Sequence, residues 1–183
     1  MPVYVAMLRG VNLGPHKRMK MEKLRASFEA LGFSGVKTYI QSGNVVFRTS
    51  KRCSTSALAE QIEECIVRDF GFSSLGILRS ASEMRAIVEN NPFLNICGGD
   101  ESRLHVIFLA GRPQQGVLKE LQKLTRAPDR SSCAGKEIYL YLPNGFAHSS
   151  LLHNPVERKY LKQATTRNWR TVCALDQLAS ELG

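Results

Sequence analysis

The stretch V-Y-V-A-M-L-R at residues 3–9 runs directly into G-V-N-L-G at 10–14, and the other segments of the chain are placed relative to it. Both alternating sets of side chains between Val3 and Leu8 are apolar, which is typical of a central strand with two covered faces. The segment after Arg9 is rich in turn-forming residues. We therefore expect a central strand that delivers a polar turn to one edge of a sheet.

The first part of the chain predicts six elements in the order βαββαβ. Helical spacing begins at Met19 or Lys20 and stops at Gly32, and a second helix follows a capping residue among positions 54–56. Strands are expected at 3–8, 36–41, 45–49 and 75–78, with the hairpin signal Q-S-G-N at 41–44. This order is typical of a ferredoxin-like sandwich.

The pattern begins again about 100 residues later, which indicates a duplicated fold. The expected elements are a strand at 104–109, a helix at 117–124, strands at 130–134 and 137–142, a helix at 156–163, and a C-terminal helix capped by Thr171. The capping box Ser80-x-x-Glu83 opens a connecting helix between the two parts.

The sequence thus predicts an α+β fold of two ferredoxin-like (βαββαβ-type) halves packed together, with an added C-terminal helix. The predicted boundaries are an N-terminal half at 1–80, a connecting helix and loop at 81–102, and a C-terminal half with the terminal helix at 103–183.

The net charge of +9 is the most unusual bulk property of the chain. Such a charge favours an anionic partner, nucleic acid first, because its field attracts polyanions. A basic surface that only aids solubility is the alternative. No run approaches the roughly 18 apolar residues of a membrane span, and no secretory signal is visible, so we expect no membrane partner. The oligomeric state is left open.

The five cysteines are odd in number and include no C-x-x-C pair. This pattern is typical of reduced thiols in a cytoplasmic protein. The four histidines show no metal-ligand spacing, and His105 falls in the middle of a strand, where a structural role is expected. We therefore expect no metal and no cofactor.

The first candidate site lies where the first strand ends. In a βαββαβ sandwich the first and third strands are antiparallel neighbours, so the turn after Arg9 should lie beside the hairpin at 41–44, next to the start of the first helix. Backbone N–H groups at a helix start favour an anion. The compatible side chains are Arg9, Asn12, Lys17, Lys20, Gln41, Ser42 and Asn44. Two tight turns without a ligand are the alternative.

The second candidate is the C-terminal run around Arg167, Asn168 and Trp169. The sequence from 158 to 170 contains five basic residues and no acidic one, and it includes the only tryptophan. An arginine beside an exposed aromatic ring suits phosphate contact and base stacking. In the alternative, Trp169 fills the core, Asn168 ties down a turn, and the arginines face water.

Four motifs in this sequence resemble those of the bacterial domain-of-unknown-function 1697 family. They are L-R-G-V-N-L-G at 8–14, K-M-x-x-L at 20–24, Y-I-Q-S-G-N-V-V-F at 39–47 and T-T-R-N-W-R-T-V at 165–172. The resemblance implies two ferredoxin-like halves and no established activity. It also implies a basic stretch after the last hairpin, but this chain has His148 and Ser150 where the family has arginine and lysine.

Three functions remain open from the sequence. The first is a basic binding module for a phosphate-bearing ligand such as nucleic acid. The second is an enzyme acting on a small phosphorylated or carboxylated metabolite, although the sequence offers no obvious general base. The third is a structural or interaction protein whose motifs join the two halves. No catalytic residue is assigned.

Overall fold

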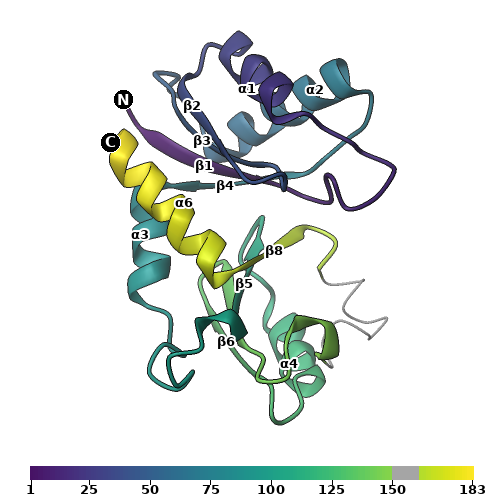
Figure 1. Ribbon diagram of the computed structural model, residues 1–183, viewed down its shortest axis with the longest axis vertical. Coiled ribbons are helices and arrows are strands. Elements are labelled where there is room, and N and C mark those ends of the chain that lie inside the picture. The colour runs from purple at the N-terminus through teal and green to yellow at the C-terminus, as the bar shows by residue number, and fades with distance from the viewer. Residues whose placement is uncertain (150–160) are drawn as a thin grey trace. The chain divides into compact units, whose positions relative to one another are not determined.

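The computed structural model describes residues 1–149 and 161–183 of the chain. These residues form five α-helices and two four-stranded antiparallel sheets, so the protein has an α+β fold that ends in an additional helix (Figure 1). The chain divides into two compact units, Met1–Ala86 together with Cys173–Gly183, and Ile87–Val172. Each unit has its own sheet.

The first unit contains the sheet with strand order β2-β3-β1-β4. Its elements are β1 (Val3–Leu8), α1 (Met21–Ala30), β2 (Ser34–Tyr39), β3 (Asn44–Arg48), α2 (Thr55–Phe70), β4 (Gly76–Ser80) and α3 (Ala81–Glu89). Since β1 pairs with both β3 and β4, the predicted central position of the first strand is confirmed. The expected order of elements in this unit is also found, with strand bounds shifted by up to two residues.

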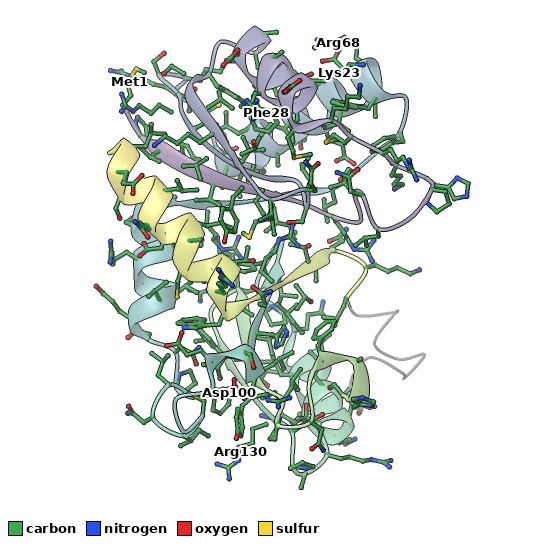
Figure 2. The ribbon with its side chains drawn as sticks, in the orientation of Figure 1. Met1, Lys23, Phe28, Arg68, Asp100 and Arg130 are labelled. Carbon is green, nitrogen blue, oxygen red and sulfur yellow. The ribbon has the colours of Figure 1, made fainter. Side chains whose placement is uncertain are left out.

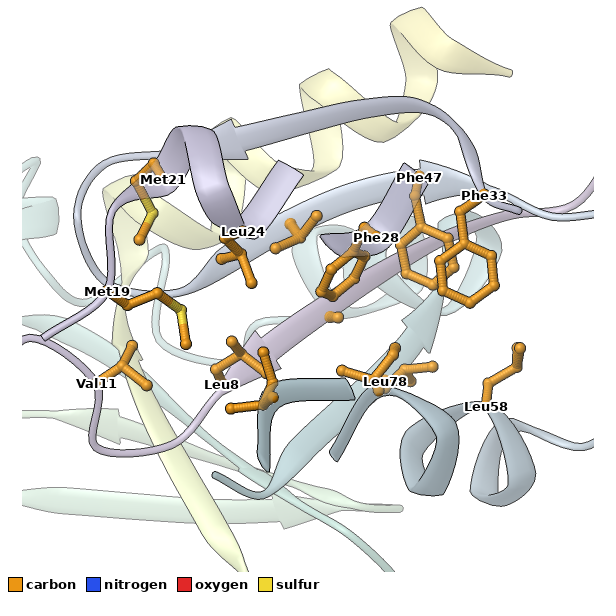
Figure 3. Packing of buried hydrophobic residues seen from close by; sticks show 14 residues of the cluster. Leu8, Val11, Met19, Met21, Leu24, Phe28, Phe33, Phe47, Leu58 and Leu78 are labelled. Carbon is orange, nitrogen blue, oxygen red and sulfur yellow. The ribbon is translucent and has the colours of Figure 1, made fainter. Parts of the chain in front are cut away.

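A hydrophobic core lies between this sheet and helices α1 and α2 (Figure 3). The sheet contributes Ala6, Leu8, Val45, Phe47 and Leu78, and the two helices contribute Leu24, Phe28, Leu58, Ile62 and Ile66. The Phe47 ring stacks on Phe33 with centroids 4.4 Å apart and meets Phe28 edge-on at 5.4 Å. Burial of each such ring contributes about 1.5–3 kcal/mol, so this aromatic group holds α1 to the sheet.

The connection between β1 and α1 is anchored in the same core at both ends. Val11 and Met19 are 2% and 3% exposed, and Figure 3 shows both near Leu8 at the end of β1. The residues between them are exposed apart from the half-buried Asn12. Two apolar anchors therefore hold a polar loop at the edge of the sheet.

The hairpin between β2 and β3 meets the end of β1 at Gly43. The Leu8 amide donates a hydrogen bond to the Gly43 carbonyl at 2.9 Å. A Cβ atom on Gly43 would lie only 2.5 Å from Val11 Cγ2 and 2.8 Å from Leu8 Cβ, and the residue has a φ of +69°. Glycine is required here because both the backbone conformation and the close approach exclude a side chain.

Helix ends in the first unit follow the expected capping chemistry. The Ser54 hydroxyl accepts a hydrogen bond from the Ala57 amide at 3.2 Å, so the predicted cap of α2 is confirmed. The capping box before α3 is also present: Ser80 N donates to Glu83 Oε2 at 2.8 Å, and Glu83 N donates to Ser80 Oγ at 3.1 Å. These bonds satisfy amides that the first helical turn leaves without partners.

The second unit contains the sheet with strand order β6-β7-β5-β8. Its strands and its described α-helix are β5 (Leu104–Leu109), α4 (Gln115–Leu124), β6 (Arg130–Ala134), β7 (Glu137–Tyr141) and β8 (Ala164–Asn168). Short 3-10 turns lie at Glu101–Arg103 and Phe146–His148. A separate core, with Ile107, Ile138 and Leu140 at its centre, lies between the sheet and α4. Residues 156–160 of the helix expected at 156–163 lie outside the described residues, and 161–163 form a turn.

Two expectations near the C-terminus are wrong. The sequence predicts no strand between the helix expected at 156–163 and the C-terminal helix, yet β8 pairs with β5 over Ala164–Asn168, where the β-branched Thr165 and Thr166 suit a strand. Thr171 is not the cap of the terminal helix α6 (Trp169–Leu182), because its own amide donates to Asn168 Oδ1 at 2.9 Å. Asn168 has the better capping chemistry, since a short side-chain amide reaches the amide three residues on.

The end of α6 is bound to the first unit. Arg48 Nε donates to the Leu182 carbonyl at 2.7 Å, and Arg85 pairs with Asp176 at 3.2 Å. A Cβ atom on Gly35 of β2 would lie 2.7 Å from Leu182 Cδ1, so helix and strand are in close contact. Residues 173–183 therefore group with the first unit, whereas the sequence had assigned all of 103–183 to the C-terminal half.

Three glycine substitutions near the end of β1 separate the cost of backbone strain from the cost of a steric clash. Gly43→Ala combines left-handed strain with a steric clash and should lower the free energy of unfolding by about 2–4 kcal/mol. Gly10→Ala has the strain alone, since Gly10 has a φ of +68° with nothing within 4 Å, and should cost about 1–2 kcal/mol. Gly14→Ala has neither and should change stability by less than about 0.5 kcal/mol. Urea denaturation measures all three, and equal losses at Gly43 and Gly10 would contradict the predicted clash.

The burial of His105 predicts that the stability of the second unit depends on pH. The side chain is 8% exposed, stacks on Phe146 at 4.8 Å, and has a buried Nδ1 without a hydrogen-bond partner in the described part of the chain. Burial lowers the pKa of His105 below its ordinary value of 6.5. The unfolded chain therefore binds a proton that the folded chain excludes, and the free energy of unfolding should fall as the pH drops below about 6.5.

Urea denaturation between pH 7.5 and 5 tests this dependence. His105→Phe preserves the stacked ring and should flatten the slope over that range. His148→Gln, which replaces an exposed histidine of the neighbouring turn, should keep the wild-type slope. An unchanged slope in His105→Phe would assign the pH dependence to other groups.

Candidate functional site

The turn after β1 and the β2–β3 hairpin lie side by side, as the sequence predicted from strand order. Their contact is made by Asn12, whose Nδ2 donates to the Gln41 carbonyl at 2.8 Å. The Arg9 amide also donates to the Leu75 carbonyl at 2.9 Å, which adds the start of β4 to the same edge. Three segments that are distant in sequence thus meet where β1 ends.

Asn12 holds the loop in one conformation. Its Nδ2 also donates to the Met19 carbonyl at 3.0 Å, and its Oδ1 accepts from the Met19 amide at 2.7 Å. The Asn12 amide donates to the Lys17 carbonyl at 3.1 Å, which closes the loop on itself. Asn12 therefore fixes the conformation of the loop, and the exposed side chains of the loop are the ones that a ligand can reach.

Next to this loop lies an open hollow of about 1320 Å³ at the start of α1. It is lined by Asn12, Leu13, Gly14, Pro15, Arg18, Met19, Lys20, Met21, Glu22, Arg25 and Gln41. Three of these side chains are cations and one is a carboxylate. Lys20 occupies the N-cap position of α1 and makes no side-chain hydrogen bond to the first turn, so the positive end of the helix is not capped by a side chain.

The predicted residues of this edge have different positions. Asn12, Lys20 and Gln41 line the hollow. Asn44 is fully buried and its Nδ2 donates to Ser42 Oγ at 2.7 Å, so these two side chains brace the hairpin. The other two predicted cations, Lys17 and Arg9, do not line the hollow. The Lys17 ammonium donates to the Ser73 carbonyl at 2.9 Å. Arg9 is exposed, and its backbone carbonyl accepts a hydrogen bond from the Ser74 hydroxyl.

Arg18 and Arg25 line the hollow but were not among the predicted residues. Arg25 lies four positions after Met21, so the two share a helix face, and its Nη1 donates to Thr38 Oγ1 at 2.9 Å. This spacing was visible in the sequence. It pointed to a site only once the helix was placed beside the loop.

Strained backbone is concentrated at this edge. In the described chain the non-glycine residues with positive φ are Asn12 at +56°, Lys17 at +55° and Ile40 at +49°, all in these two turns. Asparagine tolerates this conformation, but a β-branched isoleucine rarely adopts it. Ile40 is also 54% exposed, so burial of its side chain does not explain the conformation. Strain of this kind is often found at ligand sites.

The C-terminal motif belongs to the second unit and has structural contacts there. Arg167 Nη1 donates to Thr165 Oγ1 at 2.6 Å and to the Thr166 carbonyl at 2.9 Å, and burial lowers the pKa of Arg167 to about 10. Asn168 caps α6, and Trp169 is 2% exposed. The buried Trp169 and the cap at Asn168 match the alternative in which Trp169 is a core residue, but Arg167, which that alternative has facing water, is half-buried. Arg158 and Lys159 of the same basic run lie outside the described residues.

The side chains of residues 1–149 and 161–183 were compared with the requirements of a metal site and of a reactive thiol. No cluster of histidine, cysteine and carboxylate side chains there could hold a metal ion. Burial raises the pKa values of the Cys65 and Cys133 thiols, so neither is activated as a nucleophile. None of the described helices is long and apolar enough to cross a membrane.

The chain belongs to the family described as "Protein of unknown function (DUF1697)", whose model matches residues 1–139. Among solved structures, the conserved bacterial protein SP0830 from Streptococcus pneumoniae is similar to this chain, with a TM-score of 0.80 and 24% sequence identity. The match covers 97% of this chain and 98% of that protein, so the two share a fold. No curated protein matches the chain. The resemblance to this family is thereby confirmed, and three of the four motifs lie within the matched residues, whereas the motif at 165–172 lies beyond them.

Substitution of Asn12 tests its role as the organiser of the loop. Asn12→Ala removes three side-chain hydrogen bonds and leaves an alanine at positive φ, so the free energy of unfolding should fall by about 2–4 kcal/mol. Asn12→Gly removes the same bonds without the strain and should be about 1 kcal/mol less damaging. Urea denaturation measures the difference.

Asn144→Ala, at an exposed asparagine of the second unit, is the matched control and should lie within about 0.5 kcal/mol of the wild type. If Asn12→Ala were as mild as this control, the hydrogen bonds of Asn12 would not hold the loop.

Proposed function

We propose that this protein is a binding module for a phosphate-bearing ligand, with nucleic acid as the favoured class. The observation that carries the proposal is the hollow at the start of α1. Its lining has three cationic side chains, Arg18, Lys20 and Arg25, and a single carboxylate, Glu22. Arginine and lysine side chains are the usual partners of phosphate. The positive end of α1 adds to their attraction for an anion.

The rigidity of the loop also supports binding. Asn12, Val11 and Met19 hold the loop from within, by hydrogen bonds and by burial. A ligand that meets a pre-formed loop does not have to order it, so less binding free energy is lost. The strained turns at this edge are consistent with a surface maintained for binding.

The overall charge favours a polyanion over a small metabolite. The chain has 25 lysines and arginines against 16 acidic residues. A field of this sign raises the association rate of nucleic acid and supplies affinity that depends on salt.

We also propose that both units are ferredoxin-like and arose by duplication. The strand orders β2-β3-β1-β4 and β6-β7-β5-β8 are equivalent. A matching hydrogen bond supports the equivalence, because Leu109 N donates to the Lys136 carbonyl at 2.9 Å just as Leu8 N donates to that of Gly43. None of the five cysteines forms a disulfide bond, which supports a cytoplasmic location.

Fluorescence anisotropy with labelled oligonucleotides at about 50 and 200 mM salt tests the binding function. The double variant Arg18→Ala/Lys20→Ala removes two exposed cations of the hollow. It should weaken binding at least about 10-fold at the lower salt and reduce the slope of log K against log salt by about two, because each lost phosphate contact contributes about one.

The matched control is Lys119→Ala/Arg130→Ala, which removes the same two side-chain types from exposed positions outside the hollow. Its affinity should remain within about two-fold of the wild type. Equal losses in the two double variants would mean that only net charge matters. Absence of binding at 50 mM salt would refute the nucleic-acid proposal.

A further inference from the structure

Two phenylalanines form a partly exposed aromatic pair at the end of α2. Phe70 is the last residue of the helix, and Phe72 follows Gly71, which ends the helix with a φ of +76°. The two ring centroids are 6.2 Å apart. Both residues pack against the core of the first unit and remain half-buried.

Each ring has a lysine ammonium above it. Lys23 Nζ lies 4.8 Å from the centroid of Phe70 and also donates to the Asp69 carbonyl. Lys17 Nζ lies 5.8 Å from the centroid of Phe72 and donates to the Ser73 carbonyl at 2.9 Å. Both lysine residues are exposed. Two cations are thus held beside two aromatic rings.

The two lysines of the aromatic pair lie close in sequence to cations of the basic hollow. Lys17 precedes Arg18, a lining residue of the hollow, and Lys23 lies one helical turn after Lys20 on α1. The carboxylate of Asp69, next to Phe70 in the chain, pairs with Arg68, whose Nε lies 2.7 Å from Asp69 Oδ1, and this contact lowers the pKa of Asp69 well below its ordinary range. Figure 2 shows Lys23 and Arg68 close together at this end of α2.

We infer that the ligand of this surface is single-stranded nucleic acid, whose unpaired bases stack on Phe70 and Phe72 as Lys17 and Lys23 move off the rings to contact the adjoining phosphates. The inference rests on the proposed function, since the hollow binds the neighbouring phosphates. Alternation of aromatic faces and cations is the usual design of single-strand binding surfaces. A duplex would present only its phosphates, because its bases are already stacked and paired.

Anisotropy with three probes distinguishes this inference from phosphate binding alone. The probes are a labelled single strand of about 12 nucleotides, an abasic strand with the same number of phosphates, and the corresponding duplex. For each base that stacks, the wild-type protein should bind the normal strand at least about 5-fold more tightly than the abasic strand. It should also bind the normal strand more tightly than the duplex.

The variant Phe70→Leu/Phe72→Leu removes the aromatic faces and keeps apolar side chains against the core. Because both stacking rings are removed, it should lose about 25-fold or more in affinity for the normal strand and keep wild-type affinity for the abasic strand. Phe146→Leu, at a half-buried phenylalanine of the second unit, is the matched control and should change neither affinity.

The outcomes separate the two proposals. Equal wild-type affinity for the normal and abasic strands, or tighter binding of the duplex, would overturn base stacking and leave phosphate binding intact. Equal losses for both strands in the double leucine variant would also overturn it, since the rings would then only support the fold. If no probe bound at about 50 mM salt, the binding function itself would fail.

Discussion

The pairing of β1 with two neighbours at once is the constraint on which the first unit depends. Hydrogen bonds along both sides of β1 set the register of β3 and β4, and the Leu8–Gly43 bond extends the ladder to the last residue of the strand. Register determines which side chains face the core, since a shift of one residue would turn Ala6 and Leu8 away from α1 and α2. The hairpin can approach this closely only because Gly43 has no side chain.

The candidate site is a consequence of the same arrangement. β1 ends beside the hairpin, and the loop that follows leads to α1. Val11 and Met19, near the two ends of this loop, are buried in the core. The polar residues between them are thereby held outside, and Asn12 links them to the hairpin through its side-chain amide. The cations around the hollow are positioned by the core beneath them and need no contact with one another.

Much of this architecture could be predicted because it is encoded locally. The apolar strand at 3–8, the Q-S-G-N hairpin and the cap at Ser54 each leave a pattern within a few residues, and the structure contains all three. The strand β8 was missed because T-T-R-N lacks an apolar run and becomes a strand only by pairing with β5. Asn168 was weighed as a ligand residue, yet it caps α6, and a cap is recognised only when the helix start is known.

The amino-acid sequence was sufficient to establish the order of elements, the basic character of the chain and the meeting of two turns at the end of the first strand. These follow from side-chain periodicity, turn chemistry and the antiparallel arrangement that a βαββαβ order imposes. Which cations line the hollow depends on the three-dimensional fold, because Arg18 and Arg25 reach the same hollow through the direction in which α1 leaves the loop. The fold alone revealed the lysines above Phe70 and Phe72, since those contacts join residues about 50 positions apart, beyond the reach of any local pattern.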